Sequence, residues 1–82
     1  MKSRTEITDV LSDLTMYMFN RESTDIKAAN KASTLSNKLT KLHNELARAE
    51  DRSDTERITQ IRADGDVLSK ELDALVTKIK ST

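Results

Sequence analysis

From Ala28 onward, the apolar residues of the chain recur in two series that are mirror images of each other. The first series steps at alternating intervals of four and three residues, and the second steps at three and four, about a centre between Ser53 and Asp54. Apolar positions that recur every 3.5 residues form a narrow helical stripe that packs against another helix. The first seam is Ala28, Ala32, Leu35, Leu39, Leu42, Leu46 and Ala49, and the second is Ile58, Ile61, Gly65, Leu68, Leu72, Leu75 and Ile79.

The mirror symmetry predicts that the chain turns back on itself as an antiparallel helical hairpin. We expect its helices to span about residues 25–50 and 54–80, with a turn at 51–54. A single straight helix would carry polar residues such as Ser53 and Glu56 into the stripe. The spacing Ser53-x-x-Glu56 also matches a capping box, in which the two side chains satisfy free amides at a helix start. The turn contains no glycine, although glycine often ends a helix.

A rival interpretation ends a helix at Asp64-Gly65 instead of at 51–54, because this dipeptide is typical of turns. In the hairpin, Gly65 instead lies in the middle of a helix, opposite Leu42. The hairpin therefore predicts that Gly65→Ala is neutral or stabilising through its higher helix propensity.

A shorter helix is expected before the hairpin, over about residues 4–20. Ser3-x-x-Glu6 matches a capping box at its start. A turn at about 20–25 would then lead it back along the following helix. Its broad apolar face consists of Ile7, Val10, Leu11, Leu14, Tyr17 and Met18.

The residues that flank the seams predict how the helices pack. On one flank the antiparallel register sets opposite charges side by side, in the pairs Lys31 with Glu71, Lys38 with Asp64, and Glu45 with Arg57. The other flank is small and uncharged, which provides a groove for the first helix; it consists of Ala29, Ser36, Ser69 and Val76. The prediction is an all-α, three-helix bundle in which a shorter N-terminal helix packs on a coiled-coil-like hairpin, as one domain over residues 1–82.

Composition narrows the function classes. At 82 residues with 2% aromatic residues, the core is thin, and a partner subunit is a common support for so small a fold. The chain has no cysteine, which agrees with a reducing, cytoplasmic setting. Its 14 basic and 14 acidic residues cancel, which makes nucleic-acid binding unexpected. No stretch is apolar enough for a membrane span.

No catalytic, cofactor-binding or metal site is predicted. His43 is the single histidine and no cysteine accompanies it, so the spacing of a zinc or catalytic site is missing. A basic face on the second helix is the alternative candidate, as a surface that could bind nucleic-acid phosphates. It consists of Lys27, Lys31, Lys38, Lys41 and Arg48.

The run Met16, Tyr17, Met18 and Phe19 is the main candidate site. Tyr17 and Met18 belong to the apolar face of the first helix, whereas Met16 and Phe19 point elsewhere. Methionine-rich apolar surfaces adapt to protein partners. The sequence therefore predicts a protein-interaction surface here, used by a homodimer or by another protein.

In its size, lack of cysteine and heptad-patterned helices, the whole chain resembles the small accessory regulators encoded by tailed bacteriophages. Its length and character are similar to those of the lysis-inhibition accessory proteins of T-even phages. This resemblance implies a cytoplasmic protein that binds the cytoplasmic segment of a holin, a membrane protein, and delays lysis. It assigns no role to an individual residue.

Overall fold

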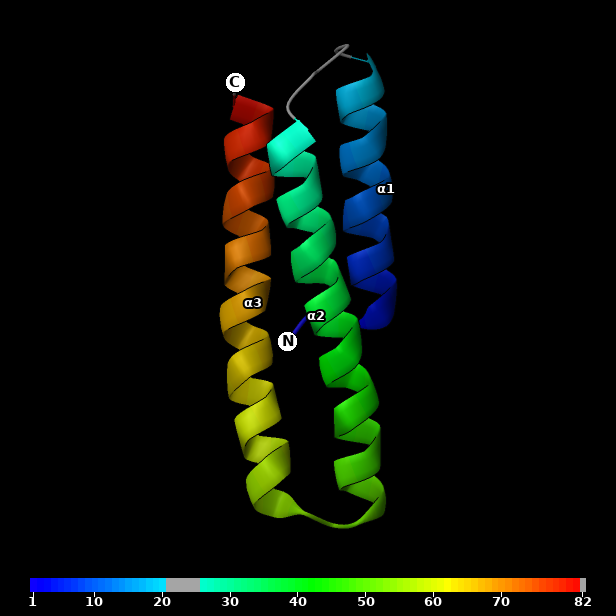
Figure 1. Cartoon of the computed structure of the whole chain (residues 1–82), viewed down its shortest axis with the longest axis vertical. Coiled ribbons are helices and arrows are strands. Elements are labelled where there is room, and N and C mark those ends of the chain that lie inside the picture. Colours follow the sequence, from blue (N-terminus) through cyan, green and yellow to red (C-terminus); the bar gives the residue numbers. More distant parts are fainter. Residues whose placement is uncertain (21–25, 82) are drawn as a thin grey trace.

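The computed structural model describes residues 1–20 and 26–81, and within these ranges the chain forms three helices. They are α1 (Arg4–Asn20), α2 (Ile26–Asp51) and α3 (Thr55–Ser81). The helices lie side by side along the long axis of a rod measuring 47 × 17 × 16 Å (Figure 1). The predicted all-α, three-helix bundle is confirmed. Apart from Asn20, the expected turn at 20–25 lies outside the described residues.

The two mirrored seams form the contact between α2 and α3. All fourteen of their residues are buried or half-buried. Leu39 and Leu72 are fully buried, as is Ile61 nearer the turn. Each buried aliphatic side chain of this size contributes about 1.5–3 kcal/mol relative to its exposed state. The seam is therefore the main source of hydrophobic stabilisation between α2 and α3.

The hairpin turns where the mirror symmetry predicts, by a mechanism that needs no glycine. Ser53 adopts a φ of 55°, the left-handed conformation usually supplied by glycine after a helix. The Ser53 amide donates to the Glu50 carbonyl at 3.1 Å, and the Asp54 amide donates to the Ala49 carbonyl at 2.9 Å. These two bonds make a Schellman motif, which satisfies carbonyls left free at the end of α2.

The capping box predicted for Ser53 and Glu56 is wrong. Asp54 is the residue before α3, and its Oδ1 atom accepts the Arg57 amide at 3.2 Å. Ser53 cannot cap α3 because its left-handed conformation closes the end of α2 one residue earlier. Ser53 therefore ends α2, and its neighbour Asp54 caps the start of α3.

The first helix docks on the small flank, as predicted. Its start carries the expected capping box, in which the Glu6 amide donates to Ser3 Oγ at 3.1 Å and the Ser3 amide to Glu6 Oε1 at 3.4 Å. Leu14 lies in the main core cluster together with Ala32. Large side chains of α1 thus meet small residues of α2, which allows the two helices to approach closely.

The charged flank forms only one of its three expected ion pairs. Arg57 Nη2 lies 2.8 Å from Glu45 Oε2, near the turn. Within the described residues, no ion pair joins Lys38 to Asp64 or Lys31 to the acidic side chain opposite. The antiparallel register is correct, but these flexible side chains remain solvated, as is common for exposed charges.

Gly65 lies within α3 at a negative φ, so the rival break at Asp64-Gly65 is excluded. The glycine has a packing role that the sequence pattern did not reveal. A Cβ built at position 65 would overlap Met1, lying 2.6 Å from its Cγ and 2.9 Å from its Cβ. The Met1 side chain is only 5% exposed. Gly65 therefore makes room for Met1 against α3.

We expect Ser53→Gly to stabilise the hairpin by about 1 kcal/mol, because glycine adopts the left-handed conformation without the cost borne by other residues. Urea denaturation followed by circular dichroism would measure the change. Thr55→Gly, at the first position of α3, serves as the control and is expected to destabilise. Equal destabilisation by both substitutions would contradict the assigned turn.

The contact with Met1 reverses the expectation for Gly65→Ala. The substitution gains up to about 1 kcal/mol of helix propensity, but it displaces a buried methionine that contributes about 1.5–3 kcal/mol. A net loss of about 1 kcal/mol in the free energy of unfolding is expected. Denaturation would measure it, and Ala63→Gly, on the exposed side of the same helix, calibrates the propensity term. A gain in stability would show that Met1 does not pack against Gly65.

Candidate protein-interaction surface

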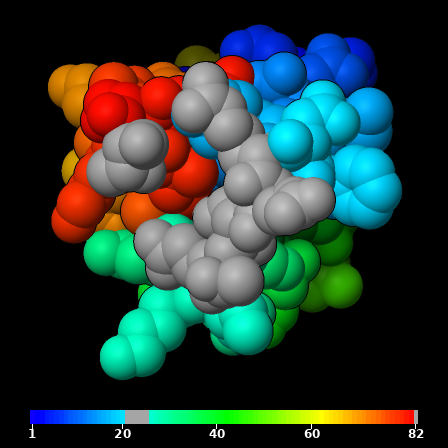
Figure 2. Space-filling view, turned by 90° about the horizontal axis from the view of Figure 1, so that it is seen from above, coloured from blue at the N-terminus to red at the C-terminus, as the bar shows by residue number. Residues whose placement is uncertain are grey.

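Three large apolar side chains are exposed toward one end of the bundle. Met16 and Phe19 of α1 are 59% and 79% exposed, and Ile26, the first residue of α2, is 69% exposed. Figure 2 looks onto this end, where the last turn of α1, the start of α2 and the end of α3 surround the axis. We call Met16, Phe19 and Ile26 the apolar patch. Large apolar side chains left this exposed are candidates for contact with a partner.

The orientation of α1 at this end is set by contacts with the last turns of α3. The Tyr17 hydroxyl donates to the Lys80 carbonyl at 2.9 Å. The Lys80 ammonium pairs with Asp13 and lies 5.9 Å from the centre of the Tyr17 ring. These contacts draw one face of α1 toward α3. Met16 and Phe19, three residues apart, are consequently turned toward solvent.

The predicted run of four residues therefore divides between two environments. Tyr17 and Met18 are half-buried and pack against the core cluster. Met16 and Phe19 are the exposed members. The structure thus places two of the four where a partner could touch them directly, while the other two support α1 from within the bundle.

The five residues of the alternative basic face are all exposed on α2. Their side of the helix is turned away from α1, along the charged flank. Glu45 interrupts the series, and Asp64 lines the same hollow as Lys38 and Lys41. The positive charge of this face is thus partly balanced by nearby carboxylates.

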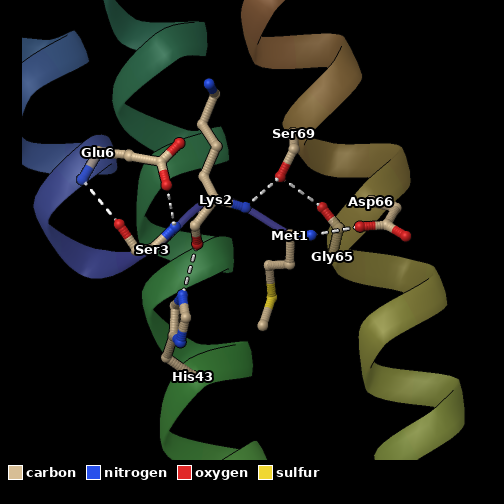
Figure 3. A network of polar contacts seen from close by, with 8 residues as sticks. All are labelled: Met1, Lys2, Ser3, Glu6, His43, Gly65, Asp66 and Ser69. Atoms are coloured by element: carbon tan, nitrogen blue, oxygen red, sulfur yellow. Dashed lines mark hydrogen bonds and ion pairs between the residues drawn. The ribbon is translucent and has the colours of Figure 1, made fainter.

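His43 is half-buried and belongs to a structural network rather than to a cluster of chemical groups (Figure 3). Its Nε2 atom donates to the Lys2 carbonyl at 2.6 Å. The Lys2 amide donates to Ser69 Oγ at 2.9 Å, and that hydroxyl donates to the Gly65 carbonyl at 2.7 Å. These bonds tie the segment before α1 to both helices of the hairpin.

Two charged groups of the same segment are also held by α3. Lys2 Nζ lies 2.8 Å from Asp73 Oδ1, and the Met1 ammonium group pairs with Asp66. The hydrogen bond from this ammonium group and its positive charge lower the pKa of the Asp66 carboxyl below its usual value. The ion pair between Asp66 and the Met1 ammonium group therefore stabilises the fold fully at a pH above the ordinary carboxyl pKa. This stabilisation is lost as the pH falls through the lowered pKa of Asp66 in the folded protein.

Within the described residues, no group of three or more His, Cys, Asp and Glu side chains is placed to hold a metal ion. None of the described helices combines the length and apolarity that crossing a bilayer requires. Comparisons with protein-family models, curated proteins and solved structures find no match.

Two exposed apolar residues were missed by the sequence analysis. Ile26 extends the apolar patch from α2, and Val67, which is 56% exposed, lies on the charged flank of α3. Each is an apolar residue out of phase with its seam. That phase mismatch is the same signal that singled out Met16 and Phe19, and it could have identified both.

We expect Tyr17→Phe to destabilise the bundle by about 1 kcal/mol, because the ring stays but its hydrogen bond to the Lys80 carbonyl is lost. Thermal unfolding followed by circular dichroism would measure the loss. Thr15→Ser, one turn from the end of the same helix, keeps a hydroxyl and serves as the control. Identical stability of Tyr17→Phe and wild type would show that this bond does not anchor α1.

Proposed function

We propose that this chain is a non-enzymatic regulator that acts by binding another protein through the apolar patch. The observation that carries the proposal is the exposure of Phe19 and Met16, which project from a helix whose opposite face is anchored in the bundle. Burying two such side chains against a partner contributes roughly 1.5–3 kcal/mol each. Apolar anchors of this kind supply much of the binding energy in protein interfaces.

The partner that suits this surface is an apolar or amphipathic segment of another protein. The resemblance to phage accessory regulators suggests one such segment, the cytoplasmic part of a holin. On this proposal the protein works in the cytoplasm and delays lysis by holding that segment. Support comes from the resemblance in size and character together with the exposed patch.

The basic face of α2 carries the alternative function, association with nucleic acid. All five of its cationic residues are exposed, which favours a surface of this kind. The chain as a whole has no net charge, however, and carboxylates lie beside Lys38 and Lys41. Binding to DNA or RNA that falls steeply with added salt would favour this alternative over the apolar patch.

We expect the double substitution Met16→Ser and Phe19→Ser to weaken partner binding more than about tenfold, because the apolar anchors are removed. The helical circular-dichroism signal should persist, since both side chains are largely exposed. Quantitative capture of partners from cells of the native host, with mass spectrometry, would compare the variant with wild type.

A matched control replaces Ala47 and Ala63, two exposed apolar residues elsewhere on the bundle, by serine. This control should capture the same partners as wild type. If the patch variant folds and captures the same partners in the same amounts, the binding surface lies elsewhere. If it unfolds, Met16 and Phe19 belong to the intramolecular core.

A further inference from the structure

Among the described residues, no helix covers the side of the hairpin opposite α1, and we call this side the open face. Two hollows of about 440 and 420 Å³ lie along it, between α2 and α3. Half-buried leucines of the seam contribute to both hollows, and the exposed Val67 lies at the edge of the first. The charged residues that line them are Lys31, Lys38, Lys41 and Glu45 of α2 and Asp64, Glu71 and Lys78 of α3.

Opposite charges line the two sides of this face. Lys31 and Lys38 belong to α2, whereas Asp64 and Glu71 belong to α3. Within the described residues, none of these four side chains forms an ion pair. Apart from Glu45 on α2 and Lys78 on α3, the hairpin therefore presents a basic edge and an acidic edge in parallel, with apolar surface between them.

A second copy of the same chain complements this pattern in one orientation. Consider a twofold axis that lies in the contact plane, parallel to the long axis of the bundle. Rotation about this axis places α2 of one copy against α3 of the other, and the two helices run antiparallel. Each residue keeps its position along the long axis of the bundle. Because Lys38 and Asp64 already share one hollow, Lys38 then meets Asp64 of the partner subunit. Lys31 likewise meets Glu71 of the partner subunit, since these two share the other hollow.

The other twofold axis within the contact plane, perpendicular to the helices, gives the opposite result. It would set α2 against α2 and α3 against α3, so that the two mainly basic edges face each other and the two mainly acidic edges face each other. Like charges placed against each other across an interface oppose binding. The charge pattern therefore favours the arrangement about the axis parallel to the helices over the other face-to-face arrangement.

We propose that a second copy of this chain docks on the open face about the twofold axis parallel to the helices. The apolar strip around Val67 and Leu68 is then shielded by the partner subunit, and the stems of Lys38 and Lys41 pack beside it. A contact over the full 47 × 17 Å face would cover at most about 800 Å² per subunit. A contact along most of the face is therefore needed to reach the roughly 800 Å² per partner of a standard stable interface.

This dimer goes beyond the proposed function and leaves the apolar patch available. α1 lies on the outer side of each hairpin, away from the open face. An axis parallel to the helices also keeps the two copies of Met16 and Phe19 at the same end of the assembly. Loss of partner binding and loss of the dimer are therefore separate outcomes, measured with different variants.

A pair of charge variants tests whether the two charged edges carry the contact. One carries Lys31→Glu with Lys38→Glu, so both of its edges are mainly acidic. The other carries Asp64→Lys with Glu71→Lys, so both of its edges are mainly basic. In sedimentation equilibrium, wild type is expected to be a dimer and each variant alone a monomer. An equimolar mixture of the two should form a heterodimer, because every edge then meets its opposite.

Val67→Lys tests the apolar part of the contact without disturbing the seam. It sets a third cation beside Lys38 and Lys41 of the partner subunit, and we expect the dimer to dissociate at least about tenfold more readily. Ser12→Lys adds the same charge to an exposed position on α1, away from the open face, and should change the dissociation constant less than twofold. Circular dichroism checks that each variant is folded. If the charge variants unfold, the comparison of Val67→Lys with its control still tests the proposed interface.

Three results would overturn the proposal. The first is a wild-type protein that stays monomeric at the highest concentration reached. The second is a dimer that Val67→Lys weakens no more than Ser12→Lys does, since its interface would lie elsewhere. The third is a mixture of the two folded charge variants that fails to associate.

Discussion

The mirrored seam between α2 and α3 is the contact on which the rest of the structure depends. Its antiparallel register determines which flanking residues of α2 and α3 lie opposite each other. On one side it brings small residues such as Ser36 and Ser69 together, where α1 and the segment before it can dock. On the other side it brings lysines level with carboxylates. A shift of the register would alter both sides at once, because the flanks have no independent means of alignment.

Periodicity predicted the helices well because it records which residues must be buried. The observed bounds of α2 and α3 differ by about one residue from those expected. The turn was harder, since Ser53 and Asp54 could each cap a helix and only the backbone conformation separates their roles. The contact of Met1 with Gly65 joins residues 64 positions apart, and the heptad pattern of the seam carries no signal for it.

The candidate surface was predictable to the extent that it depends on helical phase. Met16 and Phe19 are exposed because they lie off the apolar face of α1, as the spacing indicated. What the spacing could not supply is the anchor that fixes this face, the bond from Tyr17 to the end of α3. Charge pairing was the least predictable feature. Lys38 and Asp64 have the right register, but their side chains gain little by leaving water.

The Schellman turn at Ser53 has a consequence for folding topology. Because the seam is palindromic, two chains that opened at this turn into continuous helices could pair α2 of one with α3 of the other. Such a domain-swapped pair would reproduce the same apolar contacts between chains instead of within one. The seam itself therefore does not distinguish the hairpin from the exchanged form. That distinction falls to the few residues around Ser53, whose conformation directs the chain back onto itself.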